Sequence, residues 1–204
     1  EEVVALARRA AEAAPDSPRA LAFQRFAAAA LNNLGEAYLE RGSIDLAREK
    51  HAEALALYPD FAVAHSNLLR DGLYLPERPD EEVLADHRDW WQRHAAGIIP
   101  LALDPDRDPD RLLRGGLLSP DFRQHALAPF LLPLFEHHDR DRLQFFGYAN
   151  VRRPDETTLQ FVAQCEGGWR NIVGLTDDSV ARMIADARVD ILIDLADHQS
   201  DHRL

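Results

Sequence analysis

The spacing of apolar and polar positions differs between the two halves of this chain. Residues 1–97 are rich in Ala, Leu, Glu and Arg with apolar positions at helical spacing, whereas residues 111–204 alternate short apolar runs with helical stretches. Between them, residues 104–110 read Asp-Pro-Asp-Arg-Asp-Pro-Asp, and these prolines and repeated charges oppose regular structure. We therefore predict a helical region at 1–75, a bridging helix and linker at 76–110, and an α/β region at 111–204.

The helical region contains the spacing of a tetratricopeptide repeat. A Leu-x-x-Leu-Gly-x-x-Tyr segment over residues 31–38 is followed by Ala47, by His51 at a position where Phe is usual, and by Pro59. Gly35 would let two antiparallel helices approach closely, and the proline would end the second helix. One complete repeat is fewer than the ~3 that such an array needs for independent stability. We therefore expect these helices to be stabilised by packing against another part of the protein.

The α/β region alternates predicted strands with predicted helices, which indicates a parallel sheet wound by helices. Residues 189–195 are almost continuously apolar, as is typical of a strand covered on both faces, so we expect this last strand at the centre of the sheet. The predicted fold class is a tetratricopeptide-like array followed by a partial doubly wound parallel sheet. The predicted strands are 113–118, 143–149, 169–173 and 189–195, and the predicted helices are 126–138, 155–165 and 177–187.

Composition and charge narrow the range of partners and compartments. The formal charge of -12, from 23 Lys+Arg against 35 Asp+Glu, opposes non-specific binding to nucleic acid or to anionic membranes. Cys165 is the only cysteine, so no internal disulfide can form, and no apolar run approaches the ~18 residues of a membrane span. No targeting segment is recognisable, so we expect a cytoplasmic protein whose sequence begins inside a longer gene.

Candidate chemistry gathers where strands of the predicted sheet end, because ligands of open parallel sheets bind at the carboxyl ends of the strands. His125 closes the loop 119–125 just before a helix, whose N-terminal dipole would keep the imidazole neutral and able to accept a proton. The alternative is a histidine that only orders the loop. His198 and His202 are spaced like zinc ligands on a helix, but no helix is predicted there, so we expect no metal.

Six short motifs follow the helical part in a fixed order: Leu113–His125, Phe145–Tyr148, Asp155-x-x-Thr158, Trp169-Arg170, Gly174–Asp177 and Val189–His198. Together with the repeat helices, this ordered set resembles the bacterial SPINDLY-type and protein O-linked N-acetylglucosaminyltransferase family. The resemblance implies a repeat array that recognises a protein or peptide acceptor, joined to a glycosyltransferase of two Rossmann-like lobes. Such an enzyme moves a sugar, here expected to be N-acetylglucosamine from UDP-GlcNAc, to Ser or Thr with inversion and without a metal.

The resemblance also assigns roles to residues of this chain. It implies that His125 lines the acceptor and sugar site as the catalytic residue, and it makes Asp121 and His198 candidates for the same site. The chain would stop inside the first lobe, so the second lobe is an expected partner and the chain alone is expected to be inactive.

Several positions depart from the family pattern. Asp197 and Gln199 flank His198 where the family has Gly and Thr, and Arg182 stands where an acidic residue is common. Two questions therefore stay open at this point. The sugar could be N-acetylglucosamine or fucose, and the chain could instead belong to a non-catalytic protein-interaction module with a degenerate α/β lobe.

Overall fold

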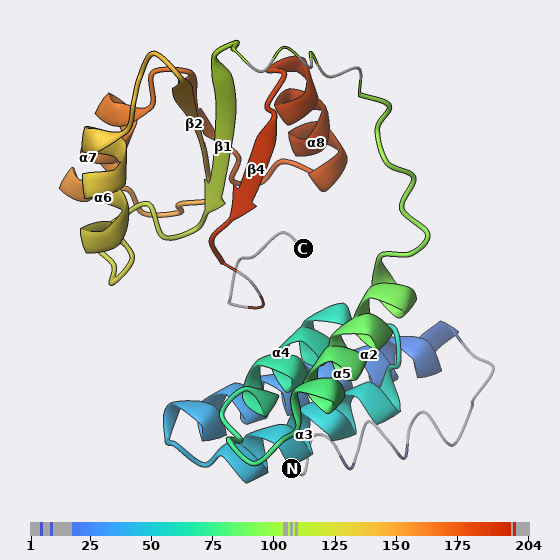
Figure 1. Cartoon of the computed structure of the whole chain (residues 1–204). Helices are drawn as coiled ribbons and strands as arrows, with labels where there is room; N and C mark the ends of the chain where they lie inside the picture. The colour runs from blue at the N-terminus through green and yellow to red at the C-terminus, as the bar shows by residue number, and fades with distance from the viewer. Residues whose placement is uncertain are drawn as a thin grey trace. The chain divides into compact units, whose positions relative to one another are not determined.

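The computed structural model describes residues 5, 9, 18–103, 106, 108, 110–196 and 198. The chain divides into two compact units, Glu1–Ile98 and Ile99–Leu204. In the described residues, the first unit is helical and the second combines helices with a sheet (Figure 1). None of the described helices is long and apolar enough to cross a membrane.

In the first unit each helix packs against the next one along the chain. Gly42, whose φ is 74°, makes the turn between the first two helices, where this left-handed conformation favours glycine. The buried core between the helices is built from small side chains and one leucine, which brings the backbones close together: Ala28, Leu31, Ala54 and Ala64. The helices are α2 (Pro18–Glu40), α3 (Ile44–Leu57), α4 (Ala62–Gly72) and α5 (Asp80–His94).

The close approach that the repeat spacing predicts occurs between α2 and α3. A Cβ atom added at Gly35 would overlap the imidazole of His51, so the two helices leave no room for a side chain there. Helix α3 ends at Leu57, two residues before Pro59. Of the predicted helical region, residues 1–17 lie outside the described residues, apart from positions 5 and 9.

The second unit contains a parallel sheet with strand order β3-β2-β1-β4 among the described residues. This confirms the fold class, a helical array followed by a partial α/β lobe. All seven predicted elements of this unit lie within about two residues of the observed bounds. The elements are β1 (Leu113–Ser119), α6 (Ala128–His137), β2 (Leu143–Ala149), α7 (Glu156–Gln164), β3 (Gly168–Asn171), α8 (Asp177–Asp186) and β4 (Ile191–Asp194).

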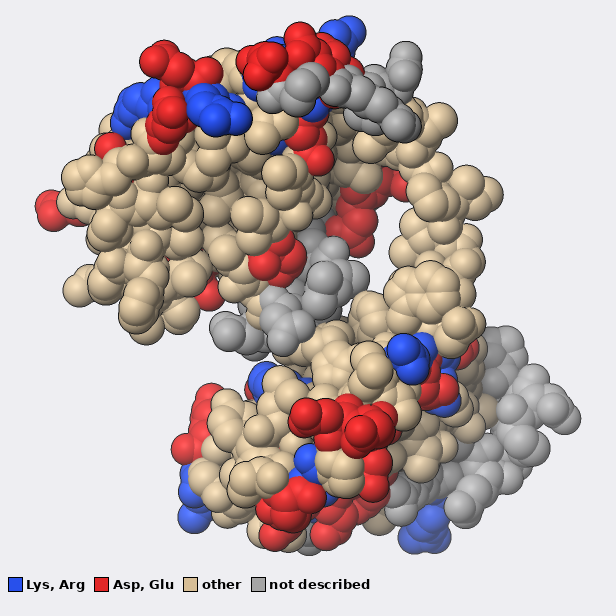
Figure 2. All heavy atoms as spheres, viewed as in Figure 1, with Lys and Arg blue, Asp and Glu red and all other residues tan. Residues whose placement is uncertain are grey.

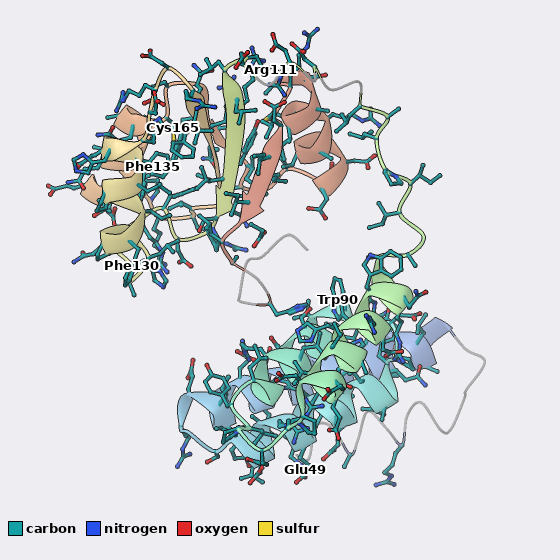
Figure 3. All side chains as sticks on the ribbon, in the orientation of Figure 1. Glu49, Trp90, Arg111, Phe130, Phe135 and Cys165 are labelled. Atoms are coloured by element: carbon teal, nitrogen blue, oxygen red, sulfur yellow. The ribbon has the colours of Figure 1, made fainter. Side chains whose placement is uncertain are left out.

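Helices cover both faces of this sheet. Successive residues of a strand point to opposite faces, so two neighbouring residues of β1 show which helices pack on each face. Leu117 of β1 belongs to a buried cluster with Phe135 of α6 and Phe161 of α7. The next residue, Leu118, belongs to a second cluster with Val180 of α8. The first cluster also contains Cys165 (Figure 3).

The outer surface of this unit is unevenly charged. On the face seen in Figure 2, acidic and basic side chains of the sheet unit gather toward the end at which the strands begin, and the remaining surface is largely uncharged. Phe130 projects from the outer side of α6 with 78% of its surface exposed, whereas Phe135 of the same helix is fully buried (Figure 3).

The last strand is not where the sequence suggests. In the described sheet β4 lies at an edge and pairs with β1 alone, so the described residues do not give it the central position that the sequence predicts. The apolar side chains of Ile191, Leu192 and Ile193 are 43–50% exposed. Continuous apolar character therefore identifies a strand that the described residues cover only in part, and the strands with two neighbours are β1 and β2.

Candidate functional site

The candidate site is built by loops that leave the sheet at the carboxyl ends of its strands. Strands β1 and β2 end level with each other, since Ser119 pairs with Ala149. The register continues past the strand ends, because the N–H of Asn150 donates to the Ser119 carbonyl at 2.9 Å and the N–H of Leu195, after β4, donates to the Leu118 carbonyl at 3.0 Å. Parallel strands thus bring the loops after β1, β2 and β4 together at their carboxyl ends.

The loop after β1 joins two of the predicted site residues. The buried hydroxyl of Ser119 accepts the N–H of Asp121 at 2.9 Å and so sets the direction in which the loop leaves the strand. Asp121, itself 7% exposed, receives Nη2 of Arg123 on one carboxylate oxygen at 3.0 Å. Its other oxygen lies 3.9 Å from Nδ1 of His125. The structure therefore places Asp121 beside the inner nitrogen of this imidazole.

The imidazole of His125 is oriented by the backbone that follows it. Nδ1 accepts a long hydrogen bond of 3.4 Å from the N–H of Leu127, directly before α6. A ring nitrogen that accepts a hydrogen bond carries no proton, so this contact favours the neutral tautomer with its proton on Nε2. In that tautomer Nε2 donates a hydrogen bond. With 36% of its side chain exposed, His125 can meet a ligand.

Asp155 connects the loop after β2 with the loop after β1. One carboxylate oxygen accepts the N–H of Thr158 at 2.9 Å and caps α7, while Thr158 Oγ1 accepts the N–H of Asp155 at 3.0 Å. The other oxygen accepts the N–H of Gln124 at 2.7 Å. The hydrogen bond to Gln124 and the cap of the helix lower the pKa of this carboxyl group. A single ionised side chain therefore fixes the residue next to His125.

The third predicted site residue, His198, follows the end of β4, a neighbour of β1 in the sheet. It is 6% exposed, so its side chain is buried. Asp194, the last residue of the strand, accepts the N–H of Ala196 at 2.7 Å and turns the chain there.

Only some of the positions that depart from the family pattern belong to the described residues. Asp197, Gln199 and His202 lie outside the described residues. Arg182 is described, and its exposed guanidinium on α8 lies 3.5 Å from the carboxylate of Asp178. Within the described part of the chain, no group of three His, Cys, Asp or Glu side chains is arranged to hold a metal ion.

Comparison with known proteins decides the family. A protein from Arabidopsis thaliana is 32% identical over 150 residues, which is 72% of this chain, and one from Eustoma exaltatum subsp. russellianum is 34% identical over 154 residues, which is 74%. Both are named "Probable UDP-N-acetylglucosamine--peptide N-acetylglucosaminyltransferase SPINDLY". A solved structure of a mutant O-GlcNAc transferase from Thermobaculum terrenum matches 98% of this chain with a TM-score of 0.80 and 28% identity. The chain belongs to the SPINDLY and O-GlcNAc transferase family.

The chain spans only part of these family members. It covers 16% of each of the two SPINDLY proteins and 43% of the Thermobaculum chain. No model of a protein family matches it.

The role of Asp155 in this site could not be predicted from the sequence. The Asp155-x-x-Thr158 pattern of the family predicts a helix start, because Asp and Thr at this spacing form a capping box. The bond from Asp155 to Gln124 joins residues 31 positions apart, and no local pattern indicates it. The bond forms because β1 and β2 end level with each other, which brings the two loops together at the carboxyl ends of the strands.

Proposed function

We propose that this chain is the acceptor-side part of a glycosyltransferase that transfers N-acetylglucosamine from UDP-GlcNAc to Ser or Thr of proteins, with inversion and without a metal. Membership of the SPINDLY and O-GlcNAc transferase family carries this proposal. The geometry that supports it is the loop after β1, which presents a partly exposed histidine at the carboxyl ends of the strands of a parallel sheet, where such folds bind their ligands.

In the proposed reaction the acceptor hydroxyl oxygen forms a bond to the anomeric carbon. The bond from that carbon to the diphosphate oxygen breaks, and the nucleotide leaves with the electron pair. The tautomer favoured by the Leu127 N–H lets Nε2 of His125 donate a hydrogen bond to an oxygen of the bound acceptor or sugar. His125 therefore orients the reacting groups in this proposal, and the hydroxyl proton goes to a phosphate oxygen of the departing nucleotide.

A sugar-transfer assay tests the proposal. The whole gene product that contains residues 1–204 is incubated with a peptide mixture and labelled UDP-GlcNAc, in parallel with GDP-fucose, in the presence of EDTA. We expect transfer from UDP-GlcNAc that EDTA does not abolish. His125→Ala should lower turnover by about 100-fold, the scale on which lost orientation acts, while peptide binding is retained. His137→Ala, at the exposed far end of α6, is the matched control and should leave turnover unchanged.

Other outcomes separate the alternatives. Transfer of fucose alone would overturn the choice of donor and keep the enzyme class. Peptide binding without transfer of either sugar would indicate the interaction module with a degenerate α/β lobe. Equal turnover by His125→Ala and the wild type would remove His125 from the mechanism.

A further inference from the structure

The carboxylate of Asp155 performs two separate tasks with its two oxygens. Oδ1 caps α7 by accepting the Thr158 N–H at 2.9 Å, and Oδ2 accepts the Gln124 N–H at 2.7 Å. The first bond lies within one helix start. The second reaches across to the loop after β1, at the peptide unit that immediately precedes His125.

We propose that Asp155 is a positioning residue for His125, acting through the Gln124 N–H to hold the imidazole at the carboxyl edge of the sheet. The role rests on the function proposed above, because it matters for activity only if His125 lines the reacting site. Asp155 itself is not assigned contact with the substrate.

The hydrogen bonds that the side chains of this loop make are local, so the His125 end of the loop depends on a bond from outside. Asp121 bonds to Ser119 and Arg123, and the imidazole of His125 bonds to Leu127, all within residues 119–127. The buried ring of Phe122 packs against Phe161 and Trp169 and holds the middle of the loop. Asp155 belongs to the loop after β2, and β2 lies next to β1 in the sheet, so its bond to Gln124 ties the end of the loop that carries His125.

The charge of Asp155 suits this task. An ionised carboxylate accepts hydrogen bonds about twice as strongly as a neutral oxygen, and its two oxygens diverge. A serine at the same position could still cap α7, because Ser caps helices about as well as Asp. Its single short hydroxyl cannot at the same time reach Gln124. Asp155→Ser therefore removes the tether and keeps the cap.

The matched control is Thr158→Ala. It removes the hydroxyl that accepts the Asp155 N–H, and so weakens the capping box, but leaves both carboxylate oxygens in place. Asp155→Asn is a second tether variant, because its amide can cap the helix through oxygen while its NH₂ group faces the Gln124 N–H, donor against donor. Circular dichroism checks that each variant folds, and the variant that folds decides the test.

The first readout is the imidazole itself, observed by nitrogen NMR of histidine-labelled chain, with the His125 signals assigned from His125→Gln. In wild type and Thr158→Ala we expect the signals of the tautomer protonated on Nε2. In Asp155→Ser we expect them to move toward the average of the two tautomers. A spectrum of Asp155→Ser identical to wild type overturns the proposal. This readout needs no enzyme activity, so it decides the positioning role even if the proposed function fails.

The second readout is turnover of the whole gene product. Asp155→Ser should lower kcat by about 10- to 100-fold, as expected for a misplaced orienting group, with KM for the nucleotide sugar changed less than about 2-fold. Thr158→Ala should keep kcat within about 2-fold of wild type. Equal losses in both variants would mean that the helix cap matters and the tether does not, which overturns the proposal. Inactive wild type would instead count against the proposed function.

Discussion

Nδ1 of His51 lies 2.6 Å from a carboxylate oxygen of Asp71, and neither side chain has any exposed surface. Around this pair, Nε2 of the same ring donates to the Asn32 carbonyl at 3.2 Å and lies 3.4 Å from Glu36, which in turn binds Arg70. A buried ion pair thus takes the position at which a tetratricopeptide repeat usually has a phenylalanine. Helices α2, α3 and α4 meet at this cluster.

Removing one member of the pair should cost far more than removing both. His51→Leu leaves the buried carboxylate of Asp71 without its hydrogen bond to the imidazole and with only Arg70, at 3.5 Å, as a charged neighbour. We expect a loss of about 3–5 kcal/mol in the free energy of unfolding of the helical unit. His51→Leu/Asp71→Leu replaces the pair with apolar side chains and should recover most of that loss. Urea unfolding followed by tryptophan fluorescence measures both.

A Trp169→Phe background makes that measurement specific. The chain has three tryptophans, and the remaining two, Trp90 and Trp91, belong to α5 of the helical unit. If the double variant proves less stable than His51→Leu alone, the pair is not the reason for the loss.

The same pair should make the helical unit less stable as the pH rises. Burial works to lower the pKa of His51, but its hydrogen bonds to Asp71 and Glu36 outweigh burial and raise the pKa above 6.5. A raised histidine pKa stabilises the fold fully below the unfolded value, and the contribution is lost as the pH passes the folded value. We expect stability to fall as the pH rises above 6.5, by at most about 1.4 kcal/mol per pH unit.

This window separates His51 from other titrating groups of the helical unit. His65 and His94 meet at 3.0 Å, and burial lowers the pKa of both, so they act below pH 6.5 and with the opposite sign. The pKa of Glu36 is lowered to about 2, first by its bond to His51, so its contribution is lost only in acid. The double variant without His51 and Asp71 should show a flat profile above pH 7. A slope that persists there would assign the pH dependence to another group.

Cys165 should resist thiol reagents in the folded protein. Its sulfur lies in the cluster under α7, and burial raises the pKa of the thiol to about 12, so almost no thiolate forms at neutral pH. Labelling by iodoacetamide at pH 7.5, followed by mass spectrometry, should be slow and should accelerate with urea as the sheet unit opens. Leu159→Cys on the same helix, at a position that is 66% exposed, is the control and should label at once. Equal rates for the two thiols in native buffer would show that Cys165 is accessible.

The bounds of helices and strands can be predicted from the sequence more accurately than which elements pack against each other. Strand β2 has the predicted bounds 143–149, because turn residues flank its apolar run and both its faces are covered. The same apolar character in β4 predicts burial that the described residues supply only in part, since coverage depends on elements far away in sequence. For the same reason the position of His125 before a helix is visible in the sequence, and its tether to Asp155 is not.

The parallel order of the strands has a consequence for how the two units form. In the helical unit, contacts link each helix with the next, so they close short stretches of chain as soon as these are synthesised. In the sheet, β1 must wait for β4, and Gly115 pairs with Ile191 across 76 positions. Pairings between distant segments form slowly, and a nascent chain leaves β1 with an open edge until nearly the whole unit has emerged from the ribosome. The helical unit therefore folds first, while the strand that carries the candidate site still lacks one of its partners.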